Sequence, residues 1–469
     1  MTSTLSKTFC VLPWIHISTR TNGHMRVCCA ANASSVQLPD SSQKIQGGEV
    51  GVMKLDGGKP ANLNYTGLMD AWNGEYMRAI RLKMLNGNQP ESCIKCYKEE
   101  SAGVRSKRQW ETEYWASKVD INTLIENTNK QTGWAPPTLY YLDLRLGSKC
   151  QLQCVMCSPH DSSAWIPSWQ KLYPKIQNPK LQKNMGWEDK GRVNGQAAYN
   201  WHLTNPTFWE DLRATYPFLK QLYFAGGEAL ITNTHYEILE DIIARGFASN
   251  IELRYNSNGL VIPHKLLRLW DSFANVKFHF SIDGSERTNQ WIRWPSDWQT
   301  VKNNLHLLDQ TNNNIVVTTA CTIQNINAFD LPRLCEWKLQ QGFKKINPWP
   351  MGAGLLNMHF AYFPPQLNIK SLPLEIKKRV RSQWEDEFFP WLESNWQLST
   401  ALPSAVGYDQ WRNHPYGIKR WQGILDFMDK EDWSERWGET LEWLELTSEY
   451  QNKPHWTQVF PELNNNSHV

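Results

Sequence analysis

Short apolar segments alternate with amphipathic ones from about residue 138 onwards. Six of the apolar segments have the length and composition of strands, at residues 138–146, 220–224, 250–256, 276–282, 314–322 and 344–350. Helical periodicity separates them, for example at residues 235–245, 298–310 and 331–341. Strands that alternate with helices are typical of βαβ units and a parallel sheet. The pattern therefore predicts an α/β fold, a partial (β/α)6 TIM-like barrel over residues 136–352, with a polar insertion at residues 174–204.

A smaller block of residues 1–110 precedes this barrel. Alternation over residues 14–19 predicts a strand, Asn22-Gly23 supplies a tight turn, and residues 25–28 form the returning strand. This hairpin folds Cys28 back towards Cys10.

After the hairpin, the block continues with less regular patterning. Residues 46–58 are a Gly-rich loop, residues 70–86 are helical in pattern, and a turn at 88–91 precedes Cys93 and Cys96. Residues 111–135 are polar, which favours a helical linker between the block and the barrel.

The strand pattern ends near residue 352, so residues 353–469 are predicted to form a Trp-rich helical region. Two apolar helical faces stand out there: Trp433, Trp437, Leu441 and Leu444, and Trp384, Phe388 and Trp391. They are expected to pack on the barrel; the alternative is that some of these aromatics line a substrate groove. The chain has 25 tryptophans, and because Trp is seldom fully buried, many are expected at domain seams or along a cleft.

Charge and targeting signals narrow the class of protein. Lys and Arg number 49 against 46 Asp and Glu, a formal net charge of +3, which gives no argument for a nucleic-acid partner or an anionic membrane. A near-neutral total does not exclude a basic patch on one face. No apolar run reaches 18 residues and the N-terminus lacks a signal-peptide pattern. A cytoplasmic location is therefore expected, where clustered cysteines serve as metal ligands or catalytic groups more often than as disulfides.

Eight of the ten cysteines lie within the first 157 residues. Cys150, Cys154 and Cys157 directly follow the first predicted barrel strand, at spacings of four and three. A [4Fe-4S] cluster takes four ligands, so three thiolates on one loop leave one iron open for a substrate or cosubstrate.

The CxxxCxxC motif after the first barrel strand resembles that of the radical S-adenosylmethionine (SAM) superfamily. The resemblance implies an enzyme whose open iron binds the amino and carboxylate groups of SAM. Reductive cleavage then gives a 5′-deoxyadenosyl radical, which abstracts a substrate hydrogen. It also implies a flavodoxin- or ferredoxin-type reductant.

Further segments match the order of that family's cosubstrate contacts. By resemblance, Gly226, Gly227 and Glu228 receive the methionine amino group, Ser257 and Asn258 contact the cosubstrate, Ser281 and Asp283 lie near the ribose, and Arg293 binds the carboxylate. The family often has an aromatic residue before the third cysteine, packed on adenine; this chain has Met156, which is apolar and adaptable enough to replace it.

The remaining clustered cysteines form a second candidate site with four thiolates. Cys10, Cys28, Cys93 and Cys96, with Gly23 and the Asn-Gly-x-x-Pro turn, resemble the twitch/SPASM auxiliary-cluster module. In this chain the module precedes the barrel instead of following it. The resemblance implies an auxiliary [4Fe-4S] cluster; a structural zinc site is the alternative. Cys29 is an alternative ligand to Cys28, which is preferred for its spacing from Gly23.

Three other residues have less specific interpretations. Cys321, on the fifth predicted strand, could face the barrel interior as a hydrogen donor, but such a cysteine is more often a small core residue. Cys335 is expected in the core, and His160 in a loop.

Several functions remain open at this level. A peptide or protein is the preferred substrate of the predicted radical SAM enzyme, and a small molecule is the alternative. A non-enzymatic two-cluster electron carrier and a zinc-stabilised nucleic-acid-binding protein are alternatives from other classes. The modest net charge disfavours the last.

Overall fold

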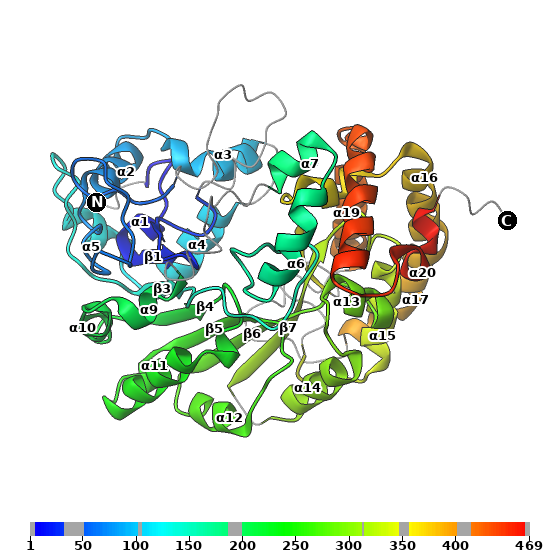
Figure 1. The fold of residues 1–469 in the computed structure, drawn as a ribbon. Coiled ribbons are helices and arrows are strands. Elements are labelled where there is room, and N and C mark those ends of the chain that lie inside the picture. The colour runs from blue at the N-terminus through cyan, green and yellow to red at the C-terminus, as the bar shows by residue number, and fades with distance from the viewer. Residues whose placement is uncertain are drawn as a thin grey trace. The chain divides into compact units, whose positions relative to one another are not determined.

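The computed structural model describes residues 5–31, 51–101, 106–185, 199–311, 314–346, 356–400 and 414–464. The chain divides into two compact units: Met1–Ser148 with Asn194–Leu253, and Lys149–Val193 with Arg254–Val469 (Figure 1). The predicted domain boundaries at residues 110, 135 and 352 do not coincide with this division, and the domain assignment stays a prediction. The described residues contain eight strands in the order β2-β1-β3-β4-β5-β6-β7-β8, and β5 contains the boundary between the units.

The first unit begins with the predicted hairpin, shorter than expected. β1 (His16–Thr19) pairs antiparallel with β2 (Met25–Arg26) across a turn in which Gly23 has a φ of 86°. The prediction of a strand from residue 14 is wrong, because α1 (Leu12–Ile15) occupies that stretch. Pro13 lies in its first turn, where a proline's missing N–H costs no helical hydrogen bond.

β1 also pairs with the first strand of the predicted barrel. It runs parallel to β3 (Tyr141–Leu144), with Ser18 opposite Asp143, and β3 runs parallel to β4 (Gln221–Phe224). Residues 1–110 were predicted to form a separate block that contributes no strand to the barrel sheet. In the structure β1 covers the backbone groups that β3 would otherwise leave unpaired at an edge.

Helices cover the strands of the first unit. They are α2 (Glu75–Leu85), α3 (Ile94–Ser101), α4 (Lys107–Ala116), α5 (Ile121–Glu126), α9 (Trp201–Thr204), α10 (Phe208–Thr215) and α11 (Asn233–Ala244), with short 3-10 turns η1 (Glu91–Cys93), η3 (Ala229–Ile231) and η4 (Ala248–Asn250). The predicted linker is packed structure: Trp115 of α4 is fully buried and stacks on Tyr141 of β3, with ring centroids 5.8 Å apart. A capping box formed by Ser106 and Gln109 starts α4.

Parallel strands form the sheet of the second unit. β6 (Asn275–Ser281), β7 (Ile315–Ile323) and β8 (Asn357–Phe360) pair in parallel, and β5 spans Glu252–Ser257. These strands confirm the predictions for residues 250–256, 276–282 and 314–322. The strand predicted at 344–350 is wrong where it can be checked, because residues 344–346 form bends; residues 347–350 lie outside the described residues. β8 lies further along the chain.

The helices of the second unit are α6 (Trp165–Leu172), α7 (Pro179–Asn184), α12 (His264–Trp270), α13 (Glu286–Ile292), α14 (Trp298–Gln310), α15 (Leu331–Gln340), α16 (Leu374–Ser382), α17 (Phe389–Thr400), α18 (His414–Asp429), α19 (Trp437–Tyr450) and α20 (Trp456–Val459). A π-helical segment, Gln383–Phe388, joins α16 to α17. Shorter 3-10 turns complete the described part of this unit: η2 (Tyr173–Lys175), η6 (Pro365–Leu367), η7 (Ile369–Ser371), η10 (Ser434–Arg436) and η11 (Pro461–Leu463).

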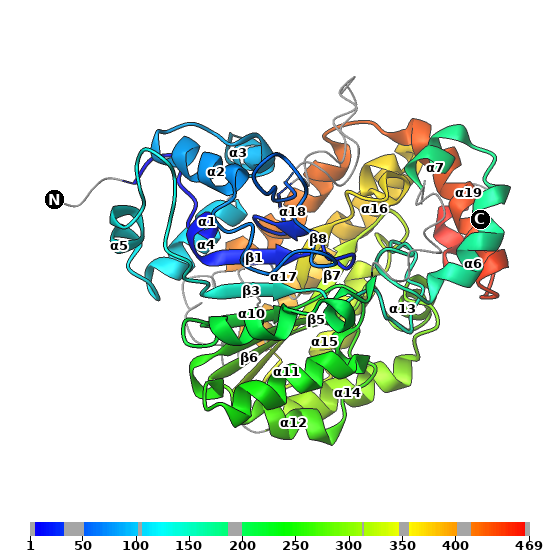
Figure 2. The same ribbon diagram turned by 60° about the vertical axis from the view of Figure 1, so that its left-hand side comes forward.

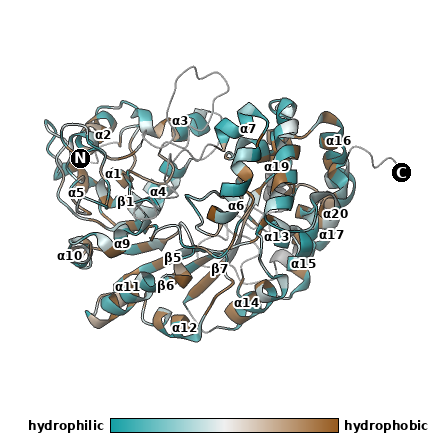
Figure 3. Ribbon diagram, viewed as in Figure 1, coloured by the Kyte–Doolittle hydropathy of each residue, from teal (hydrophilic) through white to brown (hydrophobic). Residues whose placement is uncertain are grey.

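The two faces of the second unit's sheet differ in chemistry. One face is apolar and fully buried, with Val276, Phe278 and Phe280 on β6. α12, α14 and α15 lie along this face (Figure 2): Trp270 of α12 donates a hydrogen bond to the Tyr255 hydroxyl at 3.1 Å. Hydrophobic residues follow β6 and β7, whereas hydrophobic and hydrophilic residues alternate around α12 and α14 (Figure 3). These helices are therefore amphipathic and bury their apolar sides on the sheet.

Tryptophan burial differs from the prediction. Among the tryptophans whose burial the structure describes, eleven are fully buried, including Trp14, Trp270 and Trp384. The cost of burying an indole N–H is offset where it finds an acceptor, as Trp14 does on Thr128 at 2.8 Å and Trp384 does on the carbonyl of Ala328 at 3.1 Å.

The two apolar helical faces predicted in the C-terminal region are buried in part. Trp384 and Phe388 are buried against Trp421. On α19 the buried face centres on Trp443 rather than on Leu441, which is half-buried. No helix in the described part of the chain is long and apolar enough to cross a membrane.

Lys338 of α15 is a buried ionisable side chain, and its titration makes the stability of this unit depend on pH. Its Nζ donates to the Thr319 hydroxyl of β7 at 2.9 Å. Burial lowers the pKa of Lys338 from 10.5 to about 7, against a small opposing effect of Cys335. Between these two values the unfolded chain binds more protons than the folded protein, so the free energy of unfolding rises with pH.

We predict that wild-type protein gains stability over the variant Lys338→Met as pH rises from 7 to 10, by up to about 1.4 kcal/mol per pH unit. Urea unfolding at a series of pH values measures this difference. The control is Lys378→Met, at an exposed lysine of α16, which should run parallel to wild type. Parallel curves for wild type and Lys338→Met would contradict the prediction.

Candidate cluster and cofactor site

The loop that carries Cys150, Cys154 and Cys157 follows β3 and is held in place through its backbone. The amide groups of Gln153 and Val155 donate to the carbonyls of Trp294 and Ile292, at 2.5 and 2.8 Å. The amide of Cys157 donates to the carbonyl of Cys154 at 2.9 Å, which closes a turn between the last two cysteines.

Four consecutive carbonyls of the same loop accept hydrogen bonds from side chains. We call their donors the loop clasp: Ser162 to Leu152 at 2.5 Å, Gln451 to Gln153 at 2.8 Å, Trp165 to Cys154 at 2.9 Å and Trp443 to Val155 at 3.1 Å. Leu152, Cys154 and Val155 are buried, and a buried carbonyl without a partner would cost about 1–3 kcal/mol. The clasp therefore fixes the path of the loop and with it the positions of the thiols.

The three thiols differ in exposure. Cys154 is buried, whereas Cys150 and Cys157 are partly exposed. A hydrogen bond shared with Cys157 lowers the pKa of Cys154 despite its burial, and Arg293 lowers it further. The same hydrogen bond, together with burial, raises the pKa of Cys157. The loop thus holds two thiols in contact, one of them favoured as thiolate.

Arg293 and Asp283 form a buried ion pair within the second unit. Their closest nitrogen and oxygen are 2.7 Å apart, and the Asp283 side chain is fully buried. Burial raises the pKa of Asp283, and Arg293 partly opposes this. The other Asp283 oxygen accepts from the amide of Thr322 at 2.6 Å. Arg293, which the resemblance assigns to the SAM carboxylate, is in this structure paired with Asp283 and close enough to Cys154 to favour its thiolate.

Lys453 is a second buried basic residue in the neighbourhood of Cys154. Its Nζ lies 3.3 Å from the centroid of the Trp291 ring and donates to the Trp291 carbonyl at 3.3 Å. Burial lowers its pKa well below the ordinary value, whereas Cys154 acts in the opposite direction. The sequence analysis missed Lys453, Trp443 and Gln451, because no spacing along the chain relates the C-terminal region to the cysteine loop.

Asn258 joins the loop from the end of β5. Its side-chain nitrogen is 3.9 Å from the sulfur of Cys150, and its oxygen accepts from Gln151 at 3.3 Å. The Ser257 hydroxyl accepts from the amide of Gly259 at 3.0 Å. Gly259 has a φ of 66°, and a Cβ there would lie 2.3 Å from the ring of Phe280, so only glycine fits this turn.

The remaining candidate positions of the second unit are simpler to place. Ser281 ends β6, half-buried and opposite Ala320 of β7. Met156 is half-buried in the turn between the last two cysteines, and His160 lies in the turn that follows, as expected for a loop residue.

The glycine-rich segment lies in the first unit. Gly226 has a φ of 100°, and a Cβ there would lie 2.8 Å from the Cβ of Arg145. The Glu228 carboxylate is buried and accepts from the amide of Leu230 at 3.2 Å, which caps η3. Gly227 donates its amide to the carbonyl of Gly147 at 3.4 Å. Local packing on Arg145 thus explains the requirement for glycine at position 226.

Cys321 lies on β7, and its assignment as a hydrogen donor stays a prediction. It lies on the same face of β7 as Thr319, two residues away, and Thr319 bonds to Lys338 of α15. Cys321 is 1% exposed and its burial raises the pKa of the thiol well above the usual range. Cys321 and Cys335 are both buried, and Cys321 is close enough to Asp283, Arg293 and Cys335 for their charges to act on its thiol.

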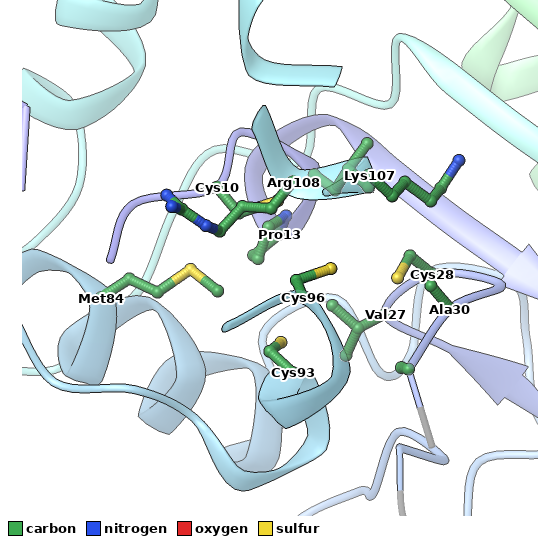
Figure 4. A pocket seen from close by; sticks show the side chains of 12 residues that line it. Cys10, Pro13, Val27, Cys28, Ala30, Met84, Cys93, Cys96, Lys107 and Arg108 are labelled. Carbon is green, nitrogen blue, oxygen red and sulfur yellow. The ribbon is translucent and has the colours of Figure 1, made fainter. Parts of the chain in front are cut away.

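The N-terminal cysteines line one pocket of the first unit (Figure 4). Cys10 precedes α1, Cys28 follows β2, Cys93 ends η1 and Cys96 lies in α3. Leu12, Val27 and Met84 add apolar walls. The hairpin therefore folds Cys28 back to Cys10 as predicted. Cys29 is half-exposed and does not line this pocket.

Burial and mutual proximity shift the pKa values of these four thiols. Burial, followed by Cys93 and Cys28, raises the pKa of Cys10, and burial raises that of Cys93 to about 12. Binding of a metal or cluster must therefore release protons. Among the described residues, no group of three or more His, Cys, Asp or Glu side chains is arranged to hold a single metal ion. The fit to a cluster rests on the four thiols that share the pocket and on the chemistry of an all-thiolate donor set.

Arg108 ties the elements around this pocket together. Its guanidinium forms an ion pair with Glu100 and donates to the carbonyl of Phe9 at 2.5 Å. Tyr97, in α3 beside Cys96, donates to the carbonyl of Thr8 at 2.8 Å. These contacts hold α3 and α4 against the segment that carries Cys10.

Comparison with known proteins gives a distant likeness only. Solved structures of native anSMEcpe with bound AdoMet and the Cp18Cys peptide, and with bound AdoMet alone, match at a TM-score of 0.32 and 14% sequence identity. The matches cover 55% and 56% of this chain and 61% and 62% of the other, so the chain spans less than two thirds of the proteins it matches. No family model and no curated protein matches the sequence.

The loop clasp generates a prediction for Trp443. The variant Trp443→Phe removes the donor to the Val155 carbonyl and should lose about 1–3 kcal/mol of stability. It should also lower the iron retained by the cysteine loop after reconstitution and desalting. Trp384→Phe is the matched control, because Trp384 is equally buried and donates to a carbonyl away from the loop.

Denaturant unfolding and iron analysis, in a background where Cys93 and Cys96 are Ala, measure both effects. We expect similar losses of stability in the two Trp variants and a loss of iron in Trp443→Phe alone. Equal iron contents would show that the clasp does not position the thiols.

Proposed function

We propose that this protein is a radical SAM enzyme, with Cys150, Cys154 and Cys157 as the ligands of a [4Fe-4S] cluster. The observation that carries the proposal is the three-thiol loop with its backbone fixed by the loop clasp. Three thiols supply one ligand fewer than the cluster takes, and two of them lie at partly exposed positions. When bound, such a cluster and SAM supply a one-electron cleavage of the sulfonium and a radical that abstracts a substrate hydrogen.

The residues around the loop have roles that follow from their contacts. Arg293 places a cation near Cys154, which favours the thiolate needed for ligation. Asp283 holds Arg293 in position through the buried ion pair. Asn258 orients the outer cysteine, Cys150, from the end of β5.

The cosubstrate contacts belong to this proposal as well. Ser257, Asn258, Ser281 and Met156, all in the second unit, are proposed to contact SAM. Gly226, Gly227 and Glu228 are proposed for its amino group. Polar groups at the carboxyl ends of barrel strands are where such sites assemble.

The N-terminal pocket is proposed to hold an auxiliary [4Fe-4S] cluster ligated by Cys10, Cys28, Cys93 and Cys96. Support comes from the shared pocket and from the exclusion of Cys29 from its lining. Full ligation by four thiolates would suit electron transfer. A flavodoxin- or ferredoxin-type protein is the proposed reductant, and a peptide or protein the proposed substrate.

The test is formation of 5′-deoxyadenosine. The protein is reconstituted anaerobically with iron and sulfide, reduced with dithionite and incubated with SAM. We expect 5′-deoxyadenosine from wild type and a loss of at least about a hundredfold in Cys154→Ala. Cys335→Ala is the control, because Cys335 is an equally buried cysteine of the second unit outside the loop. Clusters that are reduced without product, with or without candidate peptides, would support an electron carrier instead.

A further inference from the structure

The N-terminal pocket has basic side chains as well as thiols in its lining. Lys107 and Arg108, the first two residues of α4, line it together with the four cysteines, and the other described lining residues are apolar. Both basic side chains leave the same end of α4 and extend in opposite directions over the pocket (Figure 4). Because apolar surroundings screen a charge far less than water does, charges at the start of α4 act strongly on the thiols.

Arg108 is held over the pocket by contacts with three groups. Its Nε donates to the Glu100 carboxylate at 2.9 Å, and a terminal nitrogen forms an ion pair with the other oxygen of that carboxylate. A second terminal nitrogen donates to the carbonyl of Phe9, next to Cys10, at 2.5 Å. The guanidinium also lies 5.3 Å from the centroid of the Tyr97 ring. With the side chain 11% exposed, these contacts fix the cation beside the segment that carries Cys10.

Three of the four thiols interact electrostatically with Arg108. Burial raises the pKa of Cys93 to about 12, and the guanidinium opposes this rise. Burial also raises the pKa of Cys96, and the backbone amide of Arg108 opposes it through a hydrogen bond. Burial lowers the pKa of Arg108, whereas Glu100 and, less strongly, Cys10 raise it. Arg108 therefore acts on Cys93 and Cys10 through its charge and on Cys96 through its amide.

Lys107 acts on the fourth thiol. Burial raises the pKa of Cys28, and Lys107 opposes this rise. The Nζ of Lys107 donates to Glu111 of the same helix at 2.6 Å. Because Lys107 acts on one thiol and Arg108 on three, Arg108 has the wider influence on the pocket.

We propose that Arg108 raises the reduction potential of the cluster assigned to the N-terminal pocket. The inference rests on the proposed function, which assigns a [4Fe-4S] cluster to Cys10, Cys28, Cys93 and Cys96. A thiolate-ligated cluster is anionic, and an electron from the proposed reductant adds a further negative charge. A fixed cation beside the sulfurs stabilises the reduced form more than the oxidised form, and a hydrogen bond to a sulfur acts in the same direction. Arg108 supplies the cation with its guanidinium and the hydrogen bond with its amide.

Glu100 allows the effect of charge to be separated from the effect of packing. Its carboxylate is the counter-charge of Arg108 and also accepts a hydrogen bond from the Ser106 hydroxyl. Glu100→Gln keeps an acceptor oxygen and leaves the guanidinium without its counter-charge. The reduction potential should therefore fall when Arg108 loses its charge and rise when Glu100 does. A residue that only held α3 and α4 in place would not produce shifts of opposite sign.

The test is a potentiometric titration of reconstituted full-length protein, followed by electron paramagnetic resonance of the reduced cluster. Cys150, Cys154 and Cys157 are replaced by Ala throughout, so that the N-terminal pocket holds the cluster that is observed. Arg108→Gln should lower the equilibrium constant for one-electron reduction about tenfold, a shift of about 59 mV. Arg108→Lys should retain most of the potential, and Glu100→Gln should shift it in the opposite direction.

Lys130→Gln is the control, because it removes an exposed positive charge from the first unit, where the Lys130 ammonium donates only to the carbonyl of Ile125 among its printed neighbours. It should leave the potential unchanged. Iron and sulfide analysis checks that each variant holds the same amount of cluster. If Arg108→Gln holds none, the sign of the shift in Glu100→Gln decides.

Three results would overturn the inference. They are an unchanged potential in Arg108→Gln with its cluster intact, shifts of the same sign in Arg108→Gln and Glu100→Gln, and a shift in Lys130→Gln as large as that in Arg108→Gln. A pocket that takes up no cluster contradicts the auxiliary site and this inference with it. Unchanged potentials with intact 5′-deoxyadenosine formation contradict this inference alone. The expected shifts in a protein that forms no 5′-deoxyadenosine contradict the radical SAM function alone.

Discussion

The hydrogen bonds to the carbonyls of residues 152–155 are the constraint on which the second unit depends. A loop that presents three thiols exposes its own backbone groups, and most of these are buried here. Ser162 and Trp165 satisfy two carbonyls from the segment that follows the loop, whereas Trp443 and Gln451 satisfy two from a region almost 300 residues away. The C-terminal region is therefore part of the cysteine site. Tryptophan suits this role, because an indole combines a large buried surface with one N–H donor.

The burial of ionisable side chains near the loop also depends on their partners. Arg293 is buried beside the loop only because Asp283 is buried with it, and breaking such a pair costs more than the pair contributes. Lys453 rests on the ring and the carbonyl of Trp291. The N-terminal pocket differs, since its four thiols lie among apolar residues that favour the neutral form. Ligation there requires displacement of protons, whereas Cys154 already has a lowered pKa.

Much of the fold could be predicted from local pattern. The strands at β3 to β7 and the helices α14 and α15 follow directly from apolar runs and helical periodicity, and the Asn22-Gly23 turn brought Cys28 to Cys10. The pairing of strands was harder to predict. β1 pairs with β3 along an edge of β3 that would otherwise be open, and no local sequence pattern encodes this pairing. The last described strand, β8, was missed because it is a short segment of mixed polarity, whereas residues 344–346, which have strand composition, form bends.

The candidate site was predictable in its ligands but not in its supporting residues. Cysteine spacing identified the loop and the pocket, since cysteines grouped at short, fixed intervals are typical of metal and cluster ligation. Trp443, Gln451 and Lys453 act through contacts distant in sequence. The face of β7 on which Cys321 lies could not be read from the sequence, because strand periodicity allows two faces; the hydrogen bond from Lys338 to Thr319 shows which face meets α15.

The central claim is that the loop of Cys150, Cys154 and Cys157 holds a cluster with one open iron. The most direct measurement is electron paramagnetic resonance of the reduced, reconstituted protein before and after addition of SAM, with Cys93 and Cys96 replaced by Ala so that one cluster is observed. The account predicts a [4Fe-4S]⁺ signal whose g values shift when SAM is added, and the absence of this signal when Cys154 is also replaced. A signal that SAM leaves unchanged, or one that persists without Cys154, would contradict it.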